Sequence, residues 1–145
     1  MNHDGQKWVA LFARWLLGLI FLMAGVYKVF SMTPMGHAEL FFIEWFKETW
    51  IPVWMLWPLG VTIPFVELVA GAMLCLGLRV RDASIALGTI LVIVTYGHLL
   101  REPLFDTTSH IFPRFILLAI VLLIPRDRDV FTLDHMLARR SDSQN

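Results

Sequence analysis

The sequence predicts an all-α membrane protein, a polytopic four-transmembrane-helix bundle with an interfacial aromatic segment between helices 1 and 2. Of the 145 residues, 57% are hydrophobic and only 17% are charged. Soluble domains carry roughly 45–50% apolar and about 25% charged residues. A domain this small cannot hide such an excess in one core, because much of its surface stays exposed. We therefore expect one membrane domain over residues 1–145.

Four apolar stretches reach or approach the length of about 20 residues that a spanning helix needs. The first two predicted spans cover about residues 8–30 and 59–78, and the next two cover about residues 83–100 and 110–125. Residues 126–145 form a tail. A basic residue precedes the first span, as in a signal peptide, but no small-residue cleavage site follows. We therefore expect this span to be retained.

The basic residues divide unequally between the two sides that four spans create. Four lie on one side, and eight lie on the side of both chain ends: Lys7, Arg14, Arg79, Arg81, Arg126, Arg128, Arg139 and Arg140. Because cytoplasmic loops carry the excess of Lys and Arg, both termini are predicted to be cytoplasmic. Arg14, Arg79 and Arg81 are interpreted as topology determinants only. The overall balance of 12 basic and 12 acidic residues excludes the basic face that nucleic-acid binding requires.

The predicted outer loop, residues 31–58, is aromatic rather than hydrophilic. It holds four of the six tryptophans, and tryptophan is enriched at headgroup depth. Read as a helix, it places His37 with Glu44 and Lys47 on a polar face and the aromatic rings away from that face. Two interpretations stay open, an anchor that lies in the membrane surface and a lid over an outward-facing pocket.

Small and polar residues recur at alternating spacings of four and three in the first three spans. Such spacing puts each set on one helix face. Helices in lipid associate through small and polar residues, so the three faces are predicted to meet. The sets are Arg14, Gly18, Phe21, Gly25 and Lys28; Gly60, Pro64, Glu67, Gly71 and Leu74; and Ser84, Gly88, Leu91, Thr95 and His98.

Four ionisable residues form a candidate polar cluster in the outer half of the membrane: Lys28, Glu67, His98 and Arg114. A charge at the bilayer centre costs at least about 2.5–3.5 kcal/mol. Glu67 is therefore predicted to pair with Lys28, with His98 adjacent. Such a pair fixes helix packing in some proteins and belongs to a functional pocket in others, and both readings stay open.

Metal and thiol chemistry have little support in the sequence. The single cysteine excludes an internal disulfide and a CxxC motif. Paired-cysteine zinc sites are excluded for the same reason. No metal site is predicted, and no cofactor is evident from the residues themselves.

The first two spans resemble those of the DoxX family. Residues 14–30 contain Arg, Gly, Phe, Gly and Lys in the order of that family, and residues 64–81 resemble its Pro-x-x-Glu…Gly…Gly…Arg signature. Residues 131–137 are similar to its Ser-Leu-Asp ending, although RDRD replaces the usual Gly-rich approach. The matching positions are Arg14, Gly18, Gly25, Lys28, Pro64, Glu67, Gly71, Gly77 and Arg81.

The resemblance implies a small four-helix protein of the bacterial inner membrane. The family takes its name from a subunit of a thiosulfate:quinone oxidoreductase, and other members are associated with membrane oxidoreductase assemblies. It therefore implies a redox-associated subunit that interacts with quinone or with an oxidoreductase partner. A non-catalytic assembly or stability factor is the alternative, and a small proton-linked transporter is the second alternative.

Quinone is the one cofactor candidate, and whether the chain is itself an enzyme stays open. Phe21, Tyr27 and Tyr96 are the aromatic residues that we expect beside a quinone ring. Its polar contacts are expected from Lys28, Glu67 and His98. The expected partners are the lipid bilayer, an oxidoreductase partner protein and further copies of the chain, but no nucleic acid.

Overall fold

A computed structural model describes residues 3–104, 106–125 and 128–142, and within these ranges every long element is a helix and no strand occurs. Arg126, one of the eight basic residues assigned to the cytoplasmic side, lies outside the described residues, as do the side chains of Arg139 and Arg140. The elements are α1 (His3–Val26), η1 (Tyr27–Ser31), α2 (Pro34–Ala38), η2 (Glu39–Ile43), α3 (Glu44–Phe46), α4 (Val53–Leu76), α5 (Val80–Arg101), α6 (Phe112–Leu123) and α7 (Leu133–Asp142), where η1 and η2 are π-helical turns.

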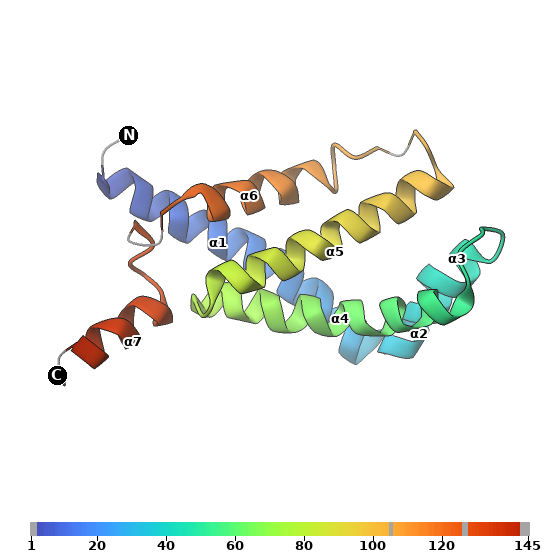
Figure 1. Cartoon of the computed structure of the whole chain (residues 1–145), viewed down its shortest axis with the longest axis horizontal. Helices are drawn as coiled ribbons and strands as arrows, with labels where there is room; N and C mark the ends of the chain where they lie inside the picture. The colour runs from blue at the N-terminus through green and yellow to red at the C-terminus, as the bar shows by residue number, and fades with distance from the viewer. Residues whose placement is uncertain (1–2, 105, 126–127, 143–145) are drawn as a thin grey trace.

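Helices α1, α4, α5 and α6 run in alternating directions along the long axis of the molecule (Figure 1). The start of α1, the turn between α4 and α5, and α7 lie at the left end of the figure. Elements α2 and α3 lie at the right end. Consecutive helices of this set therefore lie antiparallel to each other.

Three helical segments of the described chain are long and apolar enough to cross a membrane: Asp4–Ser31, Val53–Leu76 and Val80–Arg101. They overlap the first three predicted spans. Helix α6 has 12 residues and rises about 18 Å, which is less than the roughly 30 Å hydrocarbon core. The all-helical membrane character is thus confirmed, whereas a fourth span at residues 110–125 stays a prediction.

The second apolar helix begins earlier than its predicted span. α4 starts at Val53 rather than at residue 59, and both Pro58 and Pro64 lie inside it. Proline is tolerated in membrane helices because other groups bond to the carbonyls that it leaves free. The predicted boundary therefore treated Pro58 as loop when it is helical.

The backbones of α1 and α4 touch through glycine, as the spacing pattern predicts. A Cβ atom on Gly71 would lie 2.5 Å from the backbone nitrogen of Leu22, and one on Gly25 would overlap the backbone of Leu68. No side chain fits at either position. The predicted stripes are confirmed here by burial of Arg14, Gly18, Phe21 and Gly25 in α1 and of Gly60, Pro64, Glu67, Gly71 and Leu74 in α4.

The apolar core joins all four of the longer helices. Its buried residues come from α1, α4, α5 and α6: Leu17, Phe21, Ala70, Leu74, Ala83, Leu87 and Leu118. Because Leu118 of α6 is buried in this core, the short helix is part of the bundle.

Arg14 is completely buried, with 0% of its surface exposed. Its guanidinium donates to the carbonyl oxygens of Leu74 at 2.5 Å and Phe131 at 2.6 Å. Its Nε lies 3.0 Å from Asp129 Oδ2. Because the last carbonyls of a helix lack helical donors, Arg14 both completes the end of α4 and holds the tail. The interpretation of Arg14 as only a topology determinant is therefore wrong.

Gly77 caps the end of α4 and, like Arg14, contacts the tail. Its φ of +69° is left-handed, which is the usual conformation of glycine after a helix. A Cβ atom there would lie 2.7 Å from Thr132 Cα, and the Gly77 carbonyl accepts a hydrogen bond from the Asp134 amide. Arg81, another motif position, is exposed at the same end of the molecule.

The Arg14 contacts predict a strong effect of substitution at the buried arginine. Arg14→Leu is expected to lower the free energy of unfolding in detergent by about 3 kcal/mol, because Asp129 loses its buried partner. Burial raises the pKa of Asp129 even with Arg14 beside it, so the pair is costly to desolvate. The double variant Arg14→Leu/Asp129→Leu should therefore lose less than the single one.

Arg81→Leu is the matched control, since it removes an exposed arginine from the same end of the bundle. We expect a change within about 0.5 kcal/mol. Equal stabilities of the Arg14→Leu and Arg81→Leu proteins would contradict the buried role of Arg14.

Candidate functional site

Lys28 and Glu67 form an ion pair between η1, which directly follows α1, and the middle of α4. The Lys28 ammonium donates to Glu67 Oε1 at 2.9 Å and to Oε2 at 2.7 Å. The Glu67 side chain is 6% exposed and that of Lys28 is 25% exposed. This is the contact that the stripes predict. An ammonium has three N–H donors, so the two hydrogen bonds to Glu67 do not use all the donors of Lys28.

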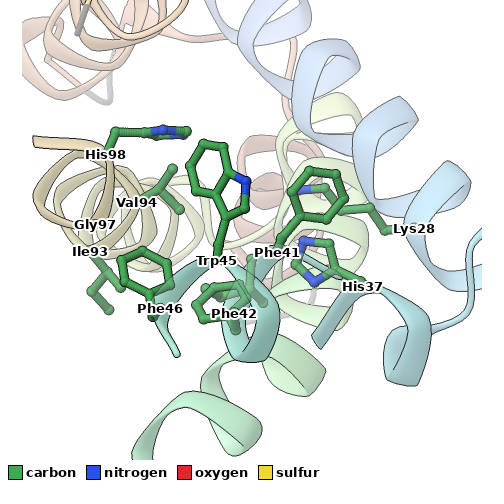
Figure 2. Close-up of a pocket in the computed structure, with 11 residues that line it drawn as sticks. Lys28, His37, Phe41, Phe42, Trp45, Phe46, Ile93, Val94, Gly97 and His98 are labelled. Atoms are coloured by element: carbon green, nitrogen blue, oxygen red, sulfur yellow. The ribbon is translucent and has the colours of Figure 1, made fainter. Parts of the chain in front are cut away.

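A pocket of about 260 Å³ lies beside the pair, and its wall is mostly aromatic (Figure 2). The segment between α1 and α4 supplies its aromatic side, and α5 supplies the opposite side. Glu67 is bonded to Lys28 but does not itself line the pocket. The lining residues are Lys28, His37, Phe41, Phe42, Trp45, Phe46, Ile63, Ile93, Val94, Gly97 and His98.

The structure places the other two residues of the predicted polar cluster differently. His98 lines the pocket from α5, and its ring meets that of Trp45 edge-on, at 5.3 Å between ring centroids and an angle of 89°. Arg114 is not one of the lining residues, and its guanidinium donates to the His110 carbonyl. That four residues make a functional site stays a prediction.

His37 is a pocket residue that the sequence interpretation missed. It is 4% exposed, and its ring lies 5.4 Å from that of Phe41 and 5.6 Å from that of Phe42. The predicted polar face with Glu44 and Lys47 is therefore wrong for His37. Residues four apart share a helix face, so the spacing of His37 and Phe41 was the available signal.

Glycine and proline in α4 explain why His37 is buried at this place. Pro64 has no N–H, so the carbonyl of Gly60, four residues earlier, lacks its helical donor. His37 Nδ1 lies 2.7 Å from that carbonyl oxygen and supplies the missing hydrogen bond. A Cβ atom on Gly60 would lie 2.6 Å from Ala38 Cα. Gly60 of the α4 stripe and the motif residue Pro64 thus hold α2 against the bundle.

A side-chain cap begins α2, and two π-helical turns carry residues that line the pocket. Thr33 Oγ1 accepts a hydrogen bond from the Gly36 amide at 3.2 Å, directly before Pro34 opens the helix. Turn η1 carries Lys28, and η2 carries Phe41 and Phe42. π-Helical turns are rare and frequently occur at functional sites.

The expected quinone-contacting aromatic set does not assemble. Phe21 lies in the apolar core, whereas Tyr27 is 57% exposed and Tyr96 is 53% exposed on the outside of the bundle. None of the three lines the pocket. The rings that do so come from η2 and α3, a segment that the sequence interpretation assigned to an anchor or a lid.

No group of three or more potential metal ligands occurs among the residues that the structure describes.

The motif glycines at positions 18, 25 and 71 serve close helix packing. Within the motif, it is therefore Lys28 and, through the Gly60 carbonyl, Pro64 that shape the pocket.

A family model described as DoxX matches residues 9–99 of the chain. The match includes both motif segments of α1 and α4 and every residue that lines the aromatic pocket. Neither the curated proteins nor the solved structures include a match to this chain.

The ion pair predicts an unequal effect of single and double substitution. Glu67→Leu is expected to lower the free energy of unfolding by about 2 kcal/mol, less than the roughly 3–5 kcal/mol of a fully buried pair, because Lys28 is partly exposed. Lys28→Met/Glu67→Leu should recover much of this loss. Thermal unfolding in detergent measures both effects.

Lys47→Met provides the comparison, since it breaks an exposed ion pair with Glu44 and is expected to change stability by less than about 1 kcal/mol. Unchanged melting of the Glu67→Leu protein would contradict a stabilising contact between Lys28 and Glu67.

Proposed function

The chain belongs to the DoxX family of membrane proteins, and from this premise we propose that it is a redox-associated membrane subunit that binds a quinone in the aromatic pocket. One observation carries the proposal: a pocket whose wall is mostly aromatic also has Lys28 among its lining residues. The quinone is the cofactor of this proposal, and the electrons come from an oxidoreductase partner. With one cysteine, the chain has no dithiol of its own to supply them.

The chemistry of the pocket matches that of a quinone head group. A quinone is a flat ring with carbonyl oxygens that accept hydrogen bonds, and aromatic side chains pack well against flat rings. An ammonium donor makes strong charge-assisted hydrogen bonds. The volume of about 260 Å³ is near the lower limit of ordinary ligand pockets, about 300 Å³, as suits one substituted ring whose tail extends into lipid.

The aromatic segment serves in this proposal as a lid rather than only as an anchor. Phe42, Trp45 and Phe46 belong to the segment and line the pocket, so they would cover a bound ring. Trp50 and Trp54, each 73% exposed, would anchor the segment at headgroup depth. The two interpretations that the sequence leaves open then apply to different parts of one segment.

We assign the protein to a bacterial inner membrane, with α6 as the fourth membrane helix and both termini in the cytoplasm. The excess of basic residues near the chain ends supports this orientation. The start of α1 and helix α7 lie at the same end of the bundle, which is consistent with it (Figure 1). Leu118 of α6 packs into the same core as the three longer helices.

A non-catalytic assembly factor is the second candidate. The two hydrogen bonds between Lys28 and Glu67 favour it, because a well-paired ion pair suits a structural role. Such a protein would retain a partner protein during purification but bind no quinone.

The quinone proposal predicts that filling the pocket removes binding. Val94 lines the pocket, so Val94→Trp is expected to weaken binding of a decyl-substituted benzoquinone at least tenfold. Calorimetric titration of the full chain in lipid nanodiscs measures this affinity.

The matched control is Val92→Trp, which places the same ring on the same helix at a position that is 69% exposed. It should bind the benzoquinone like the wild type. Equal affinity of the two variants, or no binding to the wild type, would overturn the proposed site.

A further inference from the structure

His37 presents a hydrogen-bond acceptor to the same pocket that receives the Lys28 donor. Its Nδ1 is bonded to the Gly60 carbonyl, and a carbonyl oxygen can only accept. Nδ1 must therefore carry the proton in this contact. In a neutral imidazole, the other nitrogen, Nε2, then holds the free lone pair.

The surroundings keep this ring neutral. Burial lowers the pKa of His37 below its ordinary value, and the positive charge of Lys28 lowers it further, although the bond to Gly60 acts in the opposite sense. An unperturbed histidine has a pKa of about 6.5, so a lowered value leaves the ring uncharged at neutral pH.

The ring that carries the free nitrogen lines the pocket. His37 lines the wall beside Phe41 (Figure 2), and no described hydrogen bond ends on Nε2. Nε2 is also not one of the fully buried polar side-chain atoms that lack a hydrogen-bond partner, so it is not completely buried. The proton stays on Nδ1 rather than on Nε2, because Pro64 leaves the Gly60 carbonyl without a helical donor and Nδ1–H replaces that donor.

We propose that His37 is a specificity-determining residue that accepts a hydrogen bond from a ring hydroxyl, so that the pocket prefers the reduced, dihydroxylated form of the quinone. This inference rests on the proposed function. An oxidised quinone offers only acceptors and can use the Lys28 donor but not His37. A hydroquinone has both hydroxyl donors and oxygen acceptors, and it satisfies both residues at once.

The test compares the two redox forms of one decyl-substituted benzoquinone, because they share a skeleton and differ at the ring oxygens. Binding to the full chain in nanodiscs is titrated anaerobically, with the reduced form kept reduced by dithionite. The wild type should bind the reduced form about tenfold more tightly than the oxidised form, which corresponds to one hydrogen bond.

His37→Phe keeps an aromatic ring but removes both nitrogens, and it should bring the ratio of the two affinities to about one. His37→Gln retains an amide donor and a carbonyl acceptor and should restore part of the preference. His135→Phe, a histidine of α7 at the other end of the bundle, should leave the ratio unchanged. A purely structural role of His37 would weaken both redox forms equally and leave their ratio as in the wild type.

The outcomes separate this inference from the proposed function. If the oxidised form binds to the wild type and is lost in Val94→Trp, but the two redox forms bind equally well, the role of His37 is overturned and the quinone site stands. If neither form binds to the wild type, the quinone site itself is overturned. Because the wild-type ratio needs no variant, a folding defect in His37→Phe leaves the test intact.

Discussion

The backbones of α1 and α4 approach each other more closely than any side chain allows, and the positions of the functional groups follow from this approach. Gly25 and Gly71 leave no room for a Cβ atom. The crossing brings Lys28 to Glu67 towards one end and Arg14 to the last carbonyls of α4 at the other. Helices in lipid gain little from burying apolar surface against each other, so close packing and these polar contacts hold the pair together.

The pocket depends on a break in the helical hydrogen bonding of α4 at Pro64. Pro64 leaves the Gly60 carbonyl without its helical donor, and His37 replaces that donor from outside the helix. The same bond holds α2 against α4 and determines which nitrogen of His37 carries the proton. The packing of α2 and the proposed recognition of a ring hydroxyl therefore depend on one hydrogen bond, and the aromatic rings of η2 and α3 follow from where α2 is held.

Regular periodicity explains which parts were predictable from the sequence. The stripes of α1 and α4 predicted the contact of Lys28 with Glu67, because helical spacing fixes which residues share a face. His37 was misplaced since its contacts depend on a loop and on π-helical turns, which have no regular repeat. Arg14 was misread because its partner Asp129 lies in the tail, and sequence spacing does not show that such a distant segment returns to α1.

The central claim is that a quinone ring occupies the pocket between α5 and the aromatic segment. Photolabelling with an azido-substituted benzoquinone, followed by mass spectrometric mapping, tests this location directly. Labels are expected on the segment that carries His37 and Trp45 and on the stretch of α5 around Val94, because these three residues line the pocket. Labelling confined to exposed positions such as Tyr27 and Tyr96, and undiminished by excess unlabelled quinone, would contradict it.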